Sequence, residues 1–354
     1  GGPRVRDRAG RSRRRIGTVH AHVKGQRKPR EEGGIGGMDG TPRRSKTLIW
    51  TVVLGALSFV VGVGYGQGWF PSRYGAGDEK GALNEVTPTK VRQAASLIQR
   101  GRIYDLQMTL VPGAPAFPPR YFQFSLIYNN VYNKLGNNDF RWSDEIIAGY
   151  LGTFTQVDCP GHAGIGEVFY NGRHWRDIAT PQGLKHNSCE KLPPVVTRGI
   201  LLDVAGLKGI SVLPDDYAIT AQDLEAALRR QGNLRIMAGD VVLIHTGWMS
   251  YFFTDPKRWI SREPGLVLDS ARWLAQFRPA AVGADTWGID LWPTKDGSAF
   301  APHQELITKN GVLYLENVVT RELARDRVYE FAFVMSFLKV KGAGQTWGTF
   351  VAVR

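Results

Sequence analysis

Cysteine is scarce in this chain, with only Cys159 and Cys189 among 354 residues. So low a count excludes a small disulfide-framework protein, although the two residues can pair in an exported domain. Alternatively, Cys159 is a metal-binding thiolate or a small buried residue. It is out of phase with the neighbouring Asp158 and His162, which favours the buried residue. The chain also lacks a glycine-rich phosphate loop, a Ser-His-Asp signature and internal repeats, so these features identify no nucleotide-binding protein, serine hydrolase or repeat array.

Positive charge is concentrated at the N-terminus. The net charge is +13, and residues 1–46 hold 14 Lys or Arg against 4 Asp or Glu. The remaining 308 residues hold 31 basic and 28 acidic side chains. Because this larger part is nearly neutral, its charge predicts no nucleic-acid partner. Residues 1–37 precede the first methionine and have almost no apolar content, so they are either a disordered tail or upstream sequence translated from a misplaced start.

A long apolar run follows the basic tail. Residues 47–66 form 20 uncharged, mostly apolar positions, enough to cross a bilayer as one helix. Arg43, Arg44 and Lys46 precede the run and favour a cytoplasmic N-terminus. The run is either a cleaved signal segment or a retained transmembrane anchor; its length and the absence of an Ala-x-Ala exit favour the anchor. We therefore expect a membrane-anchored or exported protein whose main domain lies on the periplasmic or extracellular side.

The rest of the chain predicts one mixed α/β domain. Residues 67–89, rich in Gly, Pro, Ser and charge, indicate a linker, and residues 90–354 form the domain. Residues 111–144 are rich in proline and aromatics with little periodicity, and they form either a lid or a surface insertion. Hydrophobic periodicity and capping signals predict helices over 89–100, 220–230 and 268–277, and strands over 103–110, 199–204, 240–245, 280–284, 311–318 and 328–338.

The segment 151–162, LGTFTQVDCPGH, carries the main candidate site. Gln156, Asp158 and His162 stand at alternate positions, so an extended chain directs an amide, a carboxylate and an imidazole to one face. These groups suit metal-assisted or acid–base chemistry. The alternative is a polar-faced edge strand with a turn at Pro160-Gly161.

A second candidate pair lies near the C-terminus, in HQELITKNGVLYLENVV. A helical start, a turn at Asn310-Gly311 and a strand would fold the chain back on itself. His303 and Glu316 would then face one another.

Several segments together carry a family resemblance. GTFTQVDCPGH, TRGILLDV, GDVVLIHTGW, GADTWGID and HQELITKNGVLYLENV follow one another in order. From about residue 100 onwards the chain resembles the cyclase family that includes bacterial kynurenine formamidases and isatin hydrolases. The resemblance implies a single compact α/β domain with a swivelling β/β/α-type barrel core, a homodimer or homotetramer, a divalent metal (Zn or Mn), and hydrolysis of a C–N bond in a small amide, aryl formamide or lactam.

The family motif is His-x-Gly-Thr-His-x-Asp-x-Pro-x-His. Asp158, Pro160 and His162 match its last three named residues, whereas Gly152 and Gln156 replace its first two histidines. A long-chain branch of the family is similar in having Gln at the second place. The replacements weaken the first metal position, because an amide oxygen is a poorer zinc ligand than imidazole.

The resemblance also implies roles for individual residues. In the family the motif aspartate bridges from the first metal position to a second one, which a downstream His and Glu complete. Asp158, His303 and Glu316 would therefore bind the metal, with Gln156 or water completing the site, and His162 would shuttle protons. Four further residues are candidate substrate contacts, although core packing is at least as good an explanation for His245 and the better one for the three aromatic residues: His245, Trp248, Trp287 and Phe122.

The missing histidines keep a second function open. A metal-poor relative would bind a small ligand on the same fold without turning it over.

Overall fold

The computed structural model describes residues 68–127 and 134–354. The predicted tail over 1–46 and the predicted apolar segment over 47–66 lie outside the described residues. Within the described part of the chain, no helix has the length and apolar character needed to cross a bilayer.

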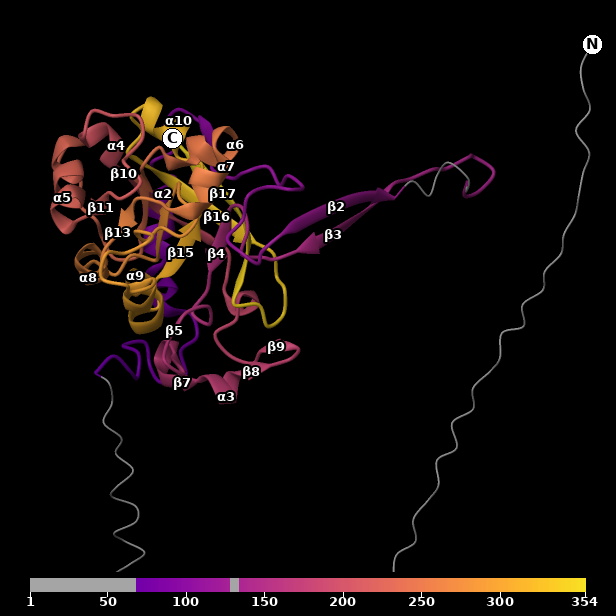
Figure 1. Cartoon of the computed structure of the whole chain (residues 1–354), viewed down its shortest axis with the longest axis horizontal. Helices are drawn as coiled ribbons and strands as arrows, with labels where there is room; N and C mark the ends of the chain where they lie inside the picture. Colours follow the sequence, from indigo (N-terminus) through magenta and orange to yellow (C-terminus); the bar gives the residue numbers. More distant parts are fainter. Residues whose placement is uncertain (1–67, 128–133) are drawn as a thin grey trace, which may run out of the picture. The chain divides into compact units, whose positions relative to one another are not determined.

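A closed barrel organises the described part of the chain (Figure 1). Seven strands pair in the order β17-β16-β10-β12-β14-β15-β4, and β4 pairs back with β17. Strands β10, β12, β14 and β15 are parallel, and the other pairings are antiparallel. The expected α/β domain with a barrel core is therefore confirmed. The barrel strands are β4 (Gln156–Asp158), β10 (Val195–Asp203), β12 (Val241–His245), β14 (Ala281–Ala284), β15 (Leu313–Glu316), β16 (Glu330–Phe337) and β17 (Gln345–Val353).

Alternation along the strands separates two cores. One set of side chains, which includes Val157, Leu243 and Phe333, comes from all round the ring and fills the barrel interior. The alternate set, which includes Ile244 and Tyr314, packs outwards against helices α5 (Ala221–Arg230) and α8 (Leu268–Gln276). Because adjacent strand residues point to opposite faces, the polar residues of β4 and β15 lie on the outside of the barrel wall.

Most of the predicted elements are present. Helix α5 begins at the capping box formed by Thr220 and Asp223, as expected. The predicted strand over 103–110 is shorter, because only β1 (Ile103–Asp105) pairs with β17, and the predicted helix over 89–100 is α2 (Pro88–Ala95). The other helical elements are η1 (Gly81–Glu85), η2 (Tyr170–Gly172), α3 (Trp175–Ile178), η3 (Cys189–Lys191), α4 (Val204–Leu207), η4 (Trp248–Ser250), α6 (Tyr251–Thr254), α7 (Pro256–Ser261), α9 (Ala301–His303), the π-helical η5 (Gln304–Lys309) and α10 (Arg321–Arg325).

The remaining strands are short, except for one projecting hairpin. Strands β2 (Phe122–Ile127) and β3 (Asp144–Gly149) pair outside the barrel and extend away from it (Figure 1). Residues 111–144 were predicted to form a lid or a surface insertion. They contribute β2, whose partner β3 lies almost wholly beyond the segment, with Ile147 opposite Phe124. The other strands are β5 (Gly164–Ile165), β6 (Val168–Phe169), β7 (Arg173–His174), β8 (Ala179–Thr180), β9 (Gly183–Leu184), β11 (Ala218–Ile219) and β13 (Gly265–Leu266).

The segment expected to be a linker packs against the domain in its described part. Glu79 forms ion pairs with Arg173, His186 and Lys191, and Ala82 is buried in the outer core. Polar and apolar residues of this segment therefore contact the domain, which a free linker would not do.

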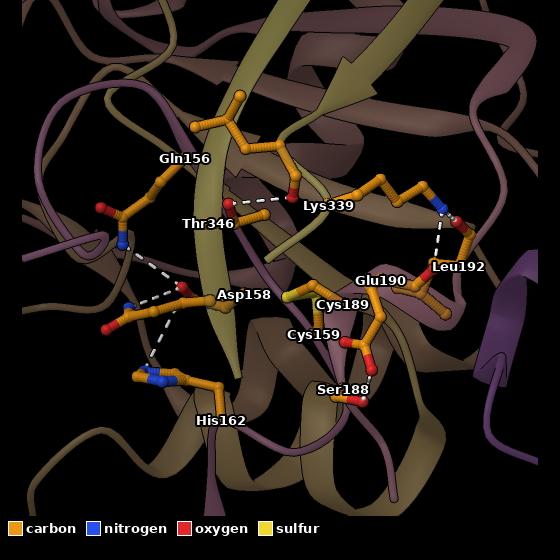
Figure 2. The surroundings of a disulfide bond; sticks show 12 residues. Gln156, Asp158, Cys159, His162, Ser188, Cys189, Glu190, Leu192, Lys339 and Thr346 are labelled. Atoms are coloured by element: carbon orange, nitrogen blue, oxygen red, sulfur yellow. Dashed lines mark hydrogen bonds and ion pairs between the residues drawn. A yellow bond between two sulfur atoms is a disulfide. The ribbon is translucent and has the colours of Figure 1, made fainter. Parts of the chain in front are cut away.

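A disulfide joins Cys159, directly after β4, to Cys189 (Figure 2). Their Cα atoms are 5.5 Å apart, a normal separation for a disulfide. The preference for a small buried Cys159 was incomplete: the side chain is fully buried, but it is buried as one half of a bridge. The backbone N–H groups of both cysteines donate to the β16–β17 connection, at Gly344 and Ala343. The bridge thus fixes the end of the strand that carries Asp158.

We expect the disulfide to stabilise the domain. The bridge closes a loop with a sequence separation of 30, so replacing both cysteines by alanine should lower the free energy of unfolding by about 2–4 kcal/mol. Denaturant unfolding with and without dithiothreitol measures this difference. The reductant should destabilise the wild type and leave the double variant unchanged; equal sensitivity of both proteins would contradict the bridge.

Candidate metal centre

Strand β4 directs two polar side chains to one side of the barrel wall. Val157 points into the interior core, while Gln156 and Asp158 point outwards and are fully buried. The strand pairs on one side with β15 and on the other with β17. The alternative of a polar-faced edge strand is therefore wrong.

A tight turn brings His162 back to Asp158. The His162 backbone N–H donates to the Cys159 carbonyl over 2.8 Å, and the imidazole Nε2 lies 3.5 Å from Asp158 Oδ2. Figure 2 shows the imidazole directed at this carboxylate. The predicted convergence of Gln156, Asp158 and His162 is confirmed.

The second predicted pair also forms. Helix α9 ends at His303 and continues through η5 to β15, which ends at Glu316. His303 Nε2 lies 3.3 Å from Glu316 Oε1 and 3.8 Å from Asp158 Oδ2. The register pairs Tyr314 with Asp158 and Glu316 with Gln156, which joins the two distant segments into one site.

The separations between donor atoms fit a shared cation. One ligand atom from each of Asp158, His162 and His303 lies within 4.8 Å of the others. Tetrahedral ligands about 2.0–2.1 Å from a zinc ion are separated by roughly 3.3 Å. Asp158 Oδ2 lies 3.5 Å from His162 Nε2 and 3.8 Å from His303 Nε2. Asp158 Oδ2 is buried without a hydrogen-bond partner among the described residues, as expected of an atom reserved for a cation. The chain therefore has a possible three-residue metal site, with Glu316 beside it.

Asp290 orients His303. Its carboxylate accepts hydrogen bonds from the His303 ring nitrogen Nδ1 over 2.8 Å and from the His303 backbone N–H over 3.2 Å. Tyr314 donates its hydroxyl to the same carboxylate. With Nδ1 held as the donor, Nε2 of His303 faces Asp158 and Glu316 as a potential ligand.

Burial and charge shift the pKa values of the cluster. Burial raises the pKa of Glu316 to about 7; Asp158 adds to this effect and His303 opposes it. Burial alone would lower the pKa of His303, but Asp290 and Glu316 outweigh it and raise that pKa well above its ordinary value. Burial lowers the pKa of His162, with His303 and Arg120 acting in the same direction and Asp158 opposing them. His162 is therefore neutral at pH 7 and able to accept a proton.

A cavity of about 290 Å³ opens onto the cluster. His162, His303 and Glu316 form its polar side. Aromatic side chains form much of the rest: Phe117 stacks on Trp287 with ring centroids 4.9 Å apart, and Phe300 lines the wall nearby. Arg120 also lines the cavity, and its guanidinium donates to the Gly152 carbonyl.

Of the four predicted substrate contacts, only Trp287 lines this cavity. His245 is buried against Asp285 and Thr320, at 3.2 Å and 2.7 Å from its Nδ1. Trp248 is fully buried in an aromatic cluster, and Phe122 packs there against Phe154. Core packing therefore accounts for these three residues.

Sequence reasoning missed several residues around the site. Asp290 lies within the quoted segment GADTWGID and was not singled out, although a carboxylate near a candidate histidine ligand is a recognisable signal. Gln345 and Arg120 carry no local signal, because they reach the site only through the pairing of β17 with β4 and through the 111–121 loop. Glu263 is fully buried behind the cavity wall, where it accepts the backbone N–H groups of Trp287 and Gly288.

The barrel and its buried carboxylate–imidazole cluster define an α/β protein with a candidate metal centre. The family model described as "Putative cyclase" matches residues 104–291, and the chain belongs to this cyclase family. A crystal structure described as a novel cyclase is 29% identical, with a TM-score of 0.74, and the match covers 80% of this chain and 98% of that one.

Isatin hydrolases share the fold at lower identity. Isatin hydrolase A from Ralstonia solanacearum is 22% identical with a TM-score of 0.55, and the match covers 76% of this chain and 98% of that one. Isatin hydrolase A from Labrenzia aggregata, bound to benzyl benzoate, is 20% identical with a TM-score of 0.52 and coverages of 74% and 96%. A search of curated protein sequences finds no match.

The raised pKa of Glu316 predicts a pH-dependent affinity for metal. A proton competes with the cation for this carboxylate, so affinity should fall as pH decreases through about 7. In the metal-free protein, the same shift should make the free energy of unfolding decrease as pH rises from the unfolded pKa of about 4.5 through the folded value of about 7.

Glu316→Gln tests this assignment. The variant should bind Zn²⁺ or Mn²⁺ more weakly than the wild type at pH 8 and should show a shallower pH dependence between pH 6 and 8, as measured by calorimetric titration. An unchanged pH profile would exclude Glu316 as the titrating group.

Proposed function

We propose that this chain is a metal-dependent hydrolase that cleaves a C–N bond in a small amide, aryl formamide or lactam. The observation that carries the proposal is the convergence of Asp158, His303 and Glu316, with His162, on one wall of a cavity. The isatin hydrolases, which share the fold, are hydrolases of a small molecule, and this likeness supports the proposal.

Each polar residue has a chemical task in this proposal. A bound divalent cation would polarise a carbonyl group and lower the pKa of water. Asp158, His303 and Glu316 would hold the cation, with Gln156 beside them. Their two carboxylates and one imidazole suit Zn or Mn. His162, neutral because of its lowered pKa, would take a proton from the attacking water and give it to the departing nitrogen.

The cavity wall favours a flat or aromatic substrate. The stacked pair of Phe117 and Trp287 offers ring faces, and Phe300 lies edge-on to Phe117, with ring centroids 6.4 Å apart. Arg120 lines the same cavity and brings a positive charge near the carboxylate that hydrolysis of an amide produces. An arylformamidase-like reaction on a non-peptide C–N bond uses both features.

A non-catalytic ligand-binding protein is the second candidate. It is favoured by one observation, the replacement of two motif histidines by Gly152 and Gln156. Metal content separates the two functions, because the binder needs no cation.

Metal analysis and a substrate panel test the proposed hydrolase directly. The purified full chain, solubilised in detergent, should contain near-stoichiometric Zn or Mn and should hydrolyse at least one member of a panel of N-formyl arylamines and cyclic imides. Asp158→Ala and His303→Ala should lose both metal and activity. Absence of metal under every loading condition would support the binding protein instead.

The proton-shuttle role of His162 has a separate signature. His162→Ala should retain nearly all of its metal and lose about 10²–10⁴-fold in kcat, the usual contribution of a positioned general base. Parallel metal analysis and steady-state kinetics measure the two quantities. A large loss of metal would make His162 a ligand, as its place in the three-residue cluster allows, and full activity would remove it from the mechanism.

We also propose that the domain acts outside the cytosol, attached through residues 47–66 or released after export. The disulfide between Cys159 and Cys189 supports this location, because such bridges persist in oxidising compartments. We propose a homodimer or homotetramer as well. The projecting β2–β3 hairpin supports this assembly, because Phe124 and Ile147 pair on one exposed face and a lone two-stranded hairpin is marginally stable in water.

A further inference from the structure

Two glutamine side chains occupy the inner side of the metal centre. Gln156 Nε2 donates to Glu316 Oε2 over 2.6 Å and to Asp158 Oδ1 over 3.2 Å. Gln345 Nε2 donates to the same Asp158 Oδ1 over 3.0 Å. Strand register places Gln156 opposite Glu316 and Gln345 opposite Asp158, so both amides are fixed by the barrel wall. In Figure 2 the amide nitrogen of Gln156 points towards Asp158.

Gln345 also fills the space beside Gly152. A Cβ atom built on Gly152 would lie 2.4–2.7 Å from the side-chain amide atoms of Gln345. The family motif has histidine at this position and at that of Gln156. No side chain fits at residue 152 unless Gln345 moves. The Gln345 amide therefore occupies the space of the first motif histidine, and the Gln156 amide occupies that of the second.

Hydrogen-bonding chemistry fixes how these amides point. Asp158 Oδ1 accepts from both amides and Glu316 Oε2 accepts from Gln156, so the NH₂ groups of Gln156 and Gln345 face these carboxylates. The Gln156 carbonyl oxygen then points away, and it is buried without a partner among the described residues. We call Asp158 Oδ1 and Glu316 Oε2, which accept these hydrogen bonds, the inner oxygens. A cation placed at the inner oxygens would meet N–H groups in place of ligand lone pairs. Four other ligand atoms receive no hydrogen bond from either glutamine and stay available to a cation: Asp158 Oδ2, Glu316 Oε1, His303 Nε2 and His162 Nε2.

We infer that this chain binds one divalent cation, because two amides occupy the first of the two metal positions that the motif resemblance implies. Gln156 and Gln345 are positioning residues whose N–H groups replace the first cation at the inner carboxylate oxygens of Asp158 and Glu316. The inference rests on the proposed function, since it concerns how many cations the proposed hydrolase holds.

Mn²⁺ stoichiometry tests the inference. The full chain in detergent is stripped of metal, loaded with excess Mn²⁺, passed through a desalting column and analysed for metal, and its electron paramagnetic resonance spectrum is recorded. One equivalent per chain with the signal of an isolated Mn²⁺ ion is expected. Two equivalents with an exchange-coupled signal would overturn the inference and leave the proposed function intact; no bound Mn²⁺ or Zn²⁺ would overturn both.

Restoring the two imidazoles should restore the first metal position, so that the chain binds a second cation. The triple variant Gly152→His, Gln156→His, Gln345→Ala frees the space beside residue 152 and should bind a second equivalent of Mn²⁺. Gln222→Ala, at an exposed position of α5, is the control and should keep one equivalent. A folded triple variant that still binds one equivalent would contradict the role assigned to the glutamines.

A single substitution separates positioning from general structural support. Gln156→Leu removes the donor and adds no ligand, so Glu316 Oε2 loses its glutamine partner and Asp158 Oδ1 keeps only that from Gln345. Because a bound cation offsets this loss, the thermal midpoint should fall more in the metal-free protein than in the Mn²⁺-loaded protein, and the Mn²⁺-induced shift should exceed that of the wild type. An equal fall in both forms would show that Gln156 acts only in packing.

Discussion

The antiparallel pairing of β4 with β15 and β17 is the constraint on which the site depends. This pairing closes the barrel and sets Gln156 opposite Glu316, with Asp158 between Tyr314 and Gln345. Each of these side chains leaves the barrel wall on its outer face, because the alternate residues fill the interior core. The same strand pairings therefore close the barrel and bring the polar side chains together.

Burying this cluster has an electrostatic cost that the surroundings offset only in part. Asp158, Asp290 and Glu316 are nearly inaccessible to water, and the raised pKa of Glu316 shows that a negative charge is disfavoured there. Protonated His303 and the N–H groups of Gln156 compensate some of that charge. A divalent cation would compensate more of it, and this supports the proposed metal site. The disulfide at Cys159 holds the end of β4 directly beside the buried Asp158 carboxylate.

Local patterns predicted the helices and strands well wherever the signal was complete within a short window. Helix α5 carries its own capping box, and β10 and β12 are continuous apolar runs. The β2–β3 hairpin was not predicted, although Phe122, Phe124 and Leu126 alternate with polar residues, because a long connection separates its two strands. The pairing of Asp158 with His303 and Glu316 was predicted through the family motif, since nothing in the residues between them specifies the distance at which they meet.

The order of the amino acids is enough to show which chemical groups the site can use: an alternating amide, carboxylate and imidazole in 151–162, a His and Glu pair further on, and no histidine at positions 152 and 156. The surroundings of these groups follow from contacts made in the folded protein. Gln345 reaches Asp158 because β17 pairs with β4, and Asp290 reaches His303 through the loop that precedes α9. Trp287 lines the cavity while Trp248 packs in the core. These differences depend on contacts between segments far apart in the chain, and the periodicity of a single segment carries no information about them.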